Sequence, residues 1–243
     1  MHDSIDMLKN NFLKIKNLGY VKSINNYISG VGLTFEQLLG KEYENFPLPD
    51  YYGIELKCKL NTSNSPISLF GITPEGKDFF EIQRLFNEYG YYYGKGKRFK
   101  GSAKFKEKRF IGIEFQFSLN INYDDKRVIL EVYNRNNELI DNNTHWDFNQ
   151  IETALVRKIN YLALIKVSKK EIAGEKYYKY NKMYVFKLKS FETFLDLIKD
   201  GIIYVNFSID TYNSGYKNGQ IHDHGTYFSI FESNLYKLFD IIE

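Results

Sequence analysis

The segment Pro-Asp-Tyr-Tyr-Gly-Ile-Glu-Leu-Lys at positions 49–57 limits the possible chemistry of this chain more than any other stretch. Asp50 lies at the entry to a predicted strand, and Glu55 and Lys57 are two residues apart, so they share one face of an extended backbone. The intervening Leu56 points the other way. A hard cation such as Mg²⁺ needs oxygen ligands and usually takes only one or two carboxylates together with phosphate oxygens. The segment therefore predicts a divalent-metal phosphodiesterase site.

The order Pro-Asp, a short gap and Glu-X-Lys resembles the catalytic core of the PD-(D/E)XK nucleases. Together with Gly-Leu-Thr-Phe-Glu-Gln-Leu-Leu-Gly at positions 32–40, the stretch is similar to restriction endonucleases of the MvaI/BcnI type, whose relatives include the MutH mismatch-repair nickase. Residues 223–230, Asp-His-Gly-Thr-Tyr-Phe-Ser-Ile, resemble a second block of that family. The resemblance implies an α/β fold: a PD-(D/E)XK nuclease core in two lobes, with a mixed β-sheet flanked by helices.

The resemblance also implies roles for single residues. Asp50 and Glu55, with the carbonyl of Leu56, would hold Mg²⁺, which polarises the scissile phosphate and lowers the pKa of a bound water. Lys57 would orient that water and stabilise the charge of the transition state. Glu36 would face the active site and order Lys57 or a second metal through a water. The alternative for Glu36 is that it is a favourable charge in the first turn of a helix.

The composition is that of one folded domain. The chain has 243 residues, of which 43% are hydrophobic, and we expect a single restriction-endonuclease-like domain over residues 1–243. The catalytic motif would lie at 32–59 and the DNA-recognition loops mainly at 90–109 and 211–226. No apolar run approaches 18 residues and no signal-peptide pattern is present, so we expect a soluble cytoplasmic protein with no membrane partner. The single cysteine, Cys58, lies on the apolar face of the catalytic strand and is expected to be structural.

Basic residues gather in two stretches although the net charge is only +3. Residues 94–109 hold eight Lys or Arg and one acid, and residues 166–189 hold eight Lys and two acids. Such clusters are typical of surfaces that bind a phosphate backbone. The alternative is an ordinary solvated surface. The candidate phosphate contacts in the first stretch are Lys95, Lys97, Arg98 and Lys100.

Hydrophobic periodicity predicts alternating helices and strands. An amphipathic helix is expected from about Ile5 to Leu18 with Gly19 as its stop, and a short helix from Phe35 toward Gly40 with Thr34 in a capping box. Two alternating strands are expected at 110–119 and 127–133, and they should pair antiparallel. Trp146 is expected to be a packing anchor before a helix. A strand, a helix and a strand are then expected at 184–188, 191–199 and 202–209.

A polar loop near the C-terminus is the best candidate for reading bases. Asn and Gln side chains can bond adenine with two hydrogen bonds, and hydroxyl and imidazole groups can donate to or accept from base edges. The candidate residues are Tyr212, Asn218, Gln220, His222 and His224. A surface hairpin would have a similar composition. Zinc at the histidines is disfavoured, because zinc sites take three or four protein ligands and the only cysteine is far away in sequence.

These observations together predict a Mg²⁺-dependent type II restriction endonuclease that cuts double-stranded DNA at a short specific sequence. The resemblance implies that it acts as a monomer that nicks one strand at a time and leaves 5′-phosphate ends, and that a cognate DNA methyltransferase is its functional, not physical, partner. The alternatives are a MutH-like strand-specific nickase of mismatch repair and a catalytically inactive DNA-binding module. The presence of Asp50, Glu55 and Lys57 argues against the inactive module.

Overall fold

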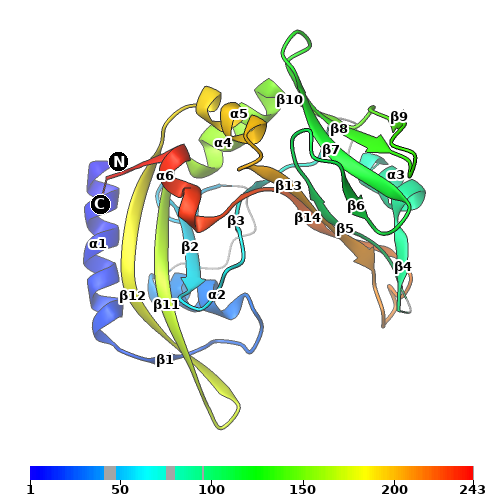
Figure 1. Cartoon of the computed structure of the whole chain (residues 1–243). Helices are drawn as coiled ribbons and strands as arrows, with labels where there is room; N and C mark the ends of the chain where they lie inside the picture. The colour runs from blue at the N-terminus through cyan, green and yellow to red at the C-terminus, as the bar shows by residue number, and fades with distance from the viewer. Residues whose placement is uncertain (41–47, 75–79, 95, 243) are drawn as a thin grey trace. The chain divides into compact units, whose positions relative to one another are not determined.

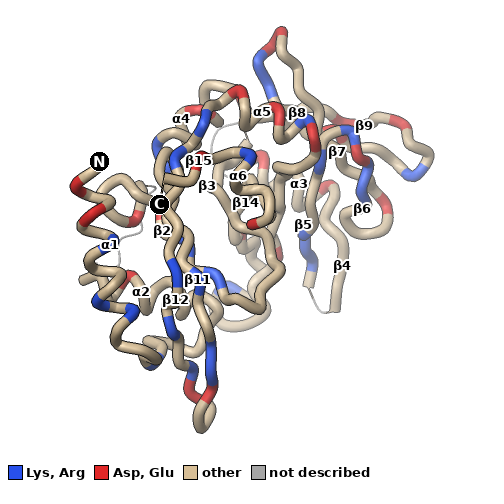
Figure 2. Tube along the Cα trace, turned by 60° about the vertical axis from the view of Figure 1, so that its left-hand side comes forward, with Lys and Arg blue, Asp and Glu red and all other residues tan. Residues whose placement is uncertain are grey.

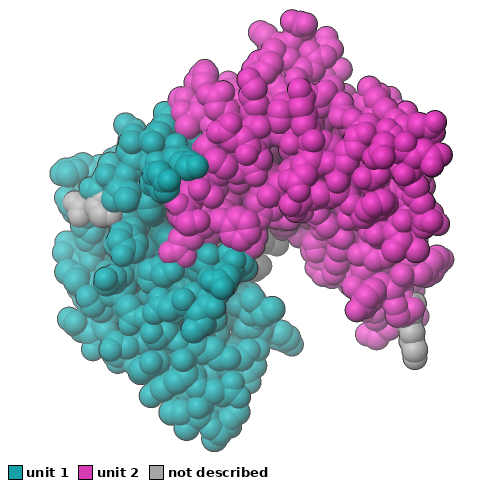
Figure 3. All heavy atoms as spheres, viewed as in Figure 1, with its two compact units in different colours: residues 1–65, 156–189, 236–243 teal, residues 66–155, 190–235 magenta. Residues whose placement is uncertain are grey.

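The computed structural model describes residues 1–40, 48–74, 80–94 and 96–242. The chain divides into two compact units, each built from segments that are distant in sequence (Figure 3). Unit 1 comprises residues 1–65, 156–189 and 236–243, and unit 2 comprises residues 66–155 and 190–235.

Unit 1 is a mixed five-stranded sheet (Figure 1). The strand order is β1-β12-β11-β2, with β15 also paired to β12. The long strands β11 and β12 form an antiparallel hairpin, whereas β2 lies parallel to β11 with Glu55 beside Leu162. The elements are α1 (His2–Asn17), β1 (Val21–Lys22), α2 (Gly30–Leu38), β2 (Glu55–Leu60), β11 (Tyr161–Ile172), β12 (Glu175–Leu188) and β15 (Phe239–Ile241), which follows α6 (Leu235–Leu238).

One apolar core joins the two helices of unit 1 to its sheet. Helix α1 buries a stripe at helical spacing, formed by Ile5, Leu8, Phe12 and Ile15. It ends as predicted before Gly19, whose φ of 71° is a backbone conformation that favours glycine. The stripe packs in one cluster with Phe35 of α2 and the inward residues of β2, β11 and β12, which include Leu56, Ile165 and Tyr180. Strand β2 therefore packs on the core through its Leu56 face, and Glu55 and Lys57 lie on the opposite face of the strand.

Unit 2 contains two antiparallel sheets. One has the order β10-β8-β7-β6 with β9 on β8, and the other has the order β3-β14-β13-β5-β4. The elements are β3 (Ile67–Gly71), α3 (Phe80–Tyr89), β4 (Tyr91–Tyr93), β5 (Gly96–Ala103), β6 (Arg109–Ile111), β7 (Phe115–Asn122), β8 (Arg127–Tyr133), β9 (Leu139–Asp141), β10 (His145–Asp147), α5 (Phe191–Lys199), β13 (Tyr204–Thr211), β14 (Ile221–Ile230) and the short 3-10 turn η1 (Glu232–Asn234). Helix α4 (Phe148–Ile159) begins in unit 2, and its residues from 156 onward belong to unit 1.

Several expectations about the elements hold. The strands expected at 110–119 and 127–133 do pair antiparallel, although the first is divided into β6 and β7. Trp146 is fully buried, and its indole nitrogen donates to the carbonyl of Ile72, so it is a packing anchor.

Two expectations were wrong. Thr34 does not cap a helix: α2 begins at Gly30, and the Thr34 hydroxyl accepts the backbone N–H of Ile24 instead. Residues 96–103, expected in a loop, form β5 between β13 and β4, and Lys and Arg recur along this strand (Figure 2). The alternation was hidden because only Phe99 and Ala103 are buried on this strand, and a side chain at Gly101 would collide with Ile111.

No described helix is long and apolar enough to cross a membrane.

Candidate active site

A tight turn brings Asp50 beside Glu55. Tyr51 and Ile54 exchange both backbone hydrogen bonds, at 2.9 and 2.8 Å, around a two-residue loop. Both loop residues have positive φ, 42° at Tyr52 and 87° at Gly53, which is the pattern of a type I′ hairpin turn. Because the turn reverses the chain, the residue before it and the residue after it become neighbours. The Asp50 carboxylate then accepts the Leu56 backbone N–H at 3.0 Å.

The three residues singled out from the sequence are brought together by this turn and by strand β2. Lys57 Nζ donates to Glu55 Oε1 at 2.8 Å, as expected for two side chains on one face of a strand. The Glu55 side chain is only 2% exposed, whereas that of Lys57 is 29% exposed. A carboxylate is therefore held at the floor of the site with an ammonium group beside it, nearer to solvent.

Lys158 is a fourth member of the site that sequence reasoning missed. Its ammonium group lies 2.8 Å from Glu55 Oε2 and 3.8 Å from Asp50 Oδ1, and it donates to the carbonyl of Leu48 at 2.7 Å. The residue is next to last in α4, four positions before Leu162, which lies beside Glu55 in the parallel pairing of β11 and β2. Lys158 could have been identified only from the pairing register of β11 and β2, which the sequence of β2 alone does not give.

Burial sets the charge properties of the site. Burial raises the pKa of Glu55 above its ordinary value. The positive charge of Lys57 opposes this rise, and the negative charge of Asp50 adds to it. Hydrogen bonds from Lys158 and Lys57 lower the pKa as well, but they do not cancel the effect of burial. Burial likewise raises the pKa of the Cys58 thiol well above its usual range, with smaller contributions from Glu36 and Asp50. Cys58 is thus a packed thiol and not a nucleophile. Glu36 belongs to α2, the helix that packs against β2.

The donor set fits a divalent cation. Asp50 and Glu55 present two carboxylates on neighbouring backbone positions, which is the number that Mg²⁺ commonly takes from a protein. Glu55 Oε2 is buried, and the cation beside it is the Lys158 ammonium group, 2.8 Å away. A buried carboxylate oxygen of this kind needs a positive charge beside it, which either an ammonium group or a metal ion supplies.

A second polar cluster lies in unit 2, on the sheet that contains β5, β13 and β14. Asp210 pairs with His222 in the register of β13 and β14, and its carboxylate lies 3.1 Å from His224 Nε2 and 3.9 Å from His222 Nδ1. Lys100 of β5 donates to the other carboxylate oxygen at 2.6 Å. Burial alone would raise the pKa of Asp210, but the hydrogen bonds from Lys100 and His224 lower it below its ordinary value.

This second cluster was only partly foreseen. The two histidines share one face of β14, with their rings 3.9 Å apart, but Asp210 was not singled out from the sequence. With Asp210, the cluster offers three ligand atoms within 4.8 Å of one another, as a metal site would. The Lys100 ammonium already neutralises the carboxylate, however, and His224 is hydrogen-bonded to it. Two imidazoles held by a carboxylate are also well suited to bond base edges.

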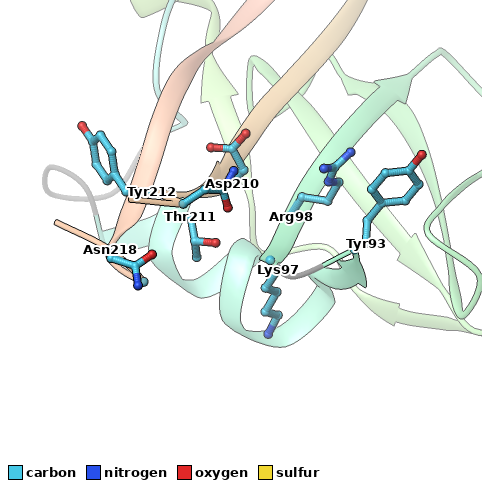
Figure 4. A pocket seen from close by; sticks show the side chains of 11 residues that line it. Tyr93, Lys97, Arg98, Asp210, Thr211, Tyr212 and Asn218 are labelled. Carbon is cyan, nitrogen blue, oxygen red and sulfur yellow. The ribbon is translucent and has the colours of Figure 1, made fainter. Parts of the chain in front are cut away.

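Four of the other residues proposed to contact DNA line one cleft in unit 2, of about 610 Å³: Lys97, Arg98, Tyr212 and Asn218. Figure 4 shows Tyr93 and Arg98 on one side of this cleft and Asp210, Thr211 and Tyr212 on the other. Arg98 stacks on Tyr93 with its guanidinium carbon 4.0 Å from the ring centre. Stacking leaves the edge of the guanidinium group available for phosphate or guanine.

Some of the side chains proposed to contact DNA already bond or stack on residues of unit 2, whereas others are exposed. Lys97 Nζ donates to the carbonyl of Asn87, and Tyr212 stacks on His222 with ring centres 4.1 Å apart. Gln220 and Asn218 are exposed in the turn that joins β13 to β14, which is closed by hydrogen bonds between Tyr212 and Gln220 and between Gly219 and Tyr212. Lys95 lies outside the described residues.

Comparison with known proteins agrees with this architecture. The model of the MvaI/BcnI restriction endonuclease family matches residues 9–239. Two solved structures are similar over 99% of this chain at 29% identity: a complex of the restriction endonuclease MvaI with its cognate DNA substrate, with a TM-score of 0.92 and 98% of that chain covered, and MvaI in the absence of DNA, with a TM-score of 0.63 and 97% covered. No curated protein matches the chain.

The turn before β2 generates a prediction about stability. Gly53→Ala should lower the free energy of unfolding by about 1 kcal/mol or more, because a side chain is strained at a φ of 87°. Tyr52→Asn is the matched control: its φ of 42° is one that Asn tolerates better than Tyr, so the stability should be kept or slightly increased. Urea unfolding of the three proteins measures both effects. Equal stability of Gly53→Ala and wild type would show that the turn is not constrained in this way.

Proposed function

Because the chain belongs to the MvaI/BcnI restriction endonuclease family, it is a type II site-specific deoxyribonuclease, and we propose that it hydrolyses double-stranded DNA with Mg²⁺ at the Asp50, Glu55 and Lys57 site. The observation that carries the proposal is the pair of carboxylates brought together by the turn at Tyr52 and Gly53, one of which, Glu55, is buried so that its negative charge must be balanced by a cation.

Each side chain has a distinct role in this reaction. Asp50 and Glu55, with the Leu56 carbonyl, would hold the ion, which supplies Lewis-acid polarisation of the phosphate and a more acidic bound water. Lys57 is partly exposed beside Glu55, so its ammonium group can hold the attacking water and stabilise the charge that develops on the phosphate oxygens. Glu36, in the helix that packs against β2, would order Lys57 or a second metal through a water.

The sheet of β5, β13 and β14 would read the DNA. Lys95, Lys97, Arg98 and Lys100 are basic residues of one stretch and would contact phosphates, and Tyr212, Asn218, Gln220, His222 and His224 would approach base edges. Support comes from the exposure of Asn218, Gln220 and His224 and from the stacked Arg98 at the cleft. The similar MvaI structure is a complex with cognate DNA.

The enzyme is proposed to work as a cytoplasmic monomer that cuts one strand per binding event and leaves 5′-phosphate ends. One Asp-Glu-X-Lys constellation is present in the sequence, so one chain carries one such site. A methyltransferase that modifies the same DNA sequence would protect the host.

Removal of the catalytic groups is the first test. Asp50→Asn, Glu55→Gln and Lys57→Met should each slow cleavage at least about 100-fold, because each removes an oriented charge from the reacting centre. Affinity for the DNA should change much less. Single-turnover cleavage in Mg²⁺ and gel shift without it measure the two effects, and wild type in EDTA should be inactive.

Lys22→Met is the control for the Lys57 variant, since Lys22 is an exposed lysine of the same unit paired with Glu175. Its cleavage rate should stay near that of wild type. Wild-type cleavage by Asp50→Asn in Mg²⁺ would refute the assignment of the site.

The residues proposed to contact bases and those proposed to contact phosphates should respond differently to substitution. Gln220→Ala and His224→Ala should reduce discrimination between the target and single-mismatch duplexes, with about 1–3 kcal/mol for each lost base contact. Arg98→Met should weaken binding to all sequences alike and reduce its salt dependence, because phosphate contacts carry little sequence information. Cleavage ratios and salt titrations separate the classes. If Gln220→Ala and His224→Ala cut matched and mismatched DNA more slowly by the same factor, these residues contact phosphate or support the fold and do not read bases.

Strand-by-strand action predicts the course of plasmid cleavage. Supercoiled plasmid with one target should pass through a nicked circle before it becomes linear, and the rate should not rise with enzyme concentration once the DNA is saturated. Agarose gels over time follow all three forms. Direct conversion to linear DNA would contradict the monomer, whereas a reaction that stops at the nicked circle would favour the MutH-like alternative.

A further inference from the structure

We propose that Lys158 is a built-in counter-ion that stabilises the two carboxylates of the active site until a divalent cation displaces it. This inference rests on the proposed function, because it takes Asp50 and Glu55 as the metal ligands. The Lys158 ammonium lies 2.8 Å from Glu55 Oε2 and 3.8 Å from Asp50 Oδ1, so it faces the same two carboxylates that would bind the ion.

Lys158 and a divalent ion would compete for the same two carboxylates. A divalent ion held by both carboxylates lies about 2.0–2.6 Å from an oxygen of each. An ammonium group 2.8 Å from one of these carboxylates and 3.8 Å from the other would then be only a few ångström from the ion. Two like charges at such a separation in a partly buried site repel strongly. Metal binding and the Lys158 contact with Glu55 are therefore competing events.

The charges explain why a counter-ion is needed. The four groups Asp50, Glu55, Lys57 and Lys158 carry two negative and two positive formal charges, so the cluster is neutral without a metal. Lys57 binds only one oxygen of Glu55, and Lys158 lies at the other. Without Lys158, Glu55 Oε2 would be buried with a negative charge and no cation beside it, which is costly.

The displaced side chain has a place to go. Lys158 lies in the last turn of α4, where a positive charge is favourable, and it also donates to the carbonyl of Leu48. Its side chain is 23% exposed and has a flexible four-carbon stem, so the ammonium group can move away from Glu55 while its stem stays packed.

The test compares Mg²⁺ binding to metal-free wild type, Lys158→Met and Arg157→Met by isothermal titration calorimetry. Lys158→Met keeps the length of the stem and removes the charge, and it should bind Mg²⁺ at least about tenfold more tightly than wild type. Arg157 is exposed and one position away in the same helix, so Arg157→Met is the control for net charge and should bind as wild type does.

The metal-free proteins provide the complementary readout. Lys158→Met should melt at a lower temperature than wild type in EDTA, and saturating Mg²⁺ should close most of that gap. Unchanged or weaker Mg²⁺ affinity in Lys158→Met, with normal binding by wild type, would overturn the counter-ion role alone. Failure of both proteins to bind Mg²⁺, in the presence or absence of DNA, would overturn the proposed metal site as well.

A measurement on wild type covers the case in which Lys158→Met does not fold. Reductive methylation with labelled formaldehyde, followed by peptide mass spectrometry, reports the accessibility of each lysine. Addition of Mg²⁺ should increase labelling of Lys158 severalfold and leave that of the exposed Lys22 unchanged. Equal labelling of Lys158 with and without Mg²⁺, at concentrations that saturate the protein, would contradict displacement.

Discussion

The structure of the proposed active site depends on one buried carboxylate, that of Glu55. Its burial raises its pKa and makes its negative charge unfavourable unless cations lie beside it. The chain supplies two of them from different directions: Lys57 from the same face of β2, and Lys158 from the end of α4. The tight turn at Gly53 adds Asp50. The result is a site whose metal-free form is neutral and whose geometry is set before any ion or substrate binds.

The two units of the chain carry different parts of the proposed work. The carboxylates and lysines of the catalytic cluster all belong to unit 1, and the described residues proposed to contact DNA all belong to unit 2. Asp210 has in unit 2 a role similar to that of Glu55 in unit 1, because it orients Lys100 and His224 by hydrogen bonds. In both places a carboxylate fixes the position of flexible basic groups, which reduces the entropy that they lose when they bind phosphate or bases.

The sequence predicts contacts within one strand or one turn much better than contacts between elements. Asp50, Glu55 and Lys57 were identifiable because a period of two and a turn define their geometry locally. Lys158 and Asp210 were missed because their positions depend on the register of β11 against β2 and of β13 against β14. Strand β5 was missed for a related reason: Gly101 leaves room for Ile111, so its inward face is not continuously apolar. The start of α2 was predicted too late in the chain, because Thr34 was expected to cap the helix, whereas its hydroxyl accepts a hydrogen bond from the distant Ile24.

The most direct test of the account is a crystal structure of the protein soaked in Mn²⁺, which takes oxygen ligands as Mg²⁺ does and can be located by its anomalous scattering. The account predicts a peak bound by Asp50 and Glu55, with the Lys158 ammonium group moved away from Glu55 Oε2. A peak held instead by Asp210, His222 and His224, with none at Asp50 and Glu55, would contradict it.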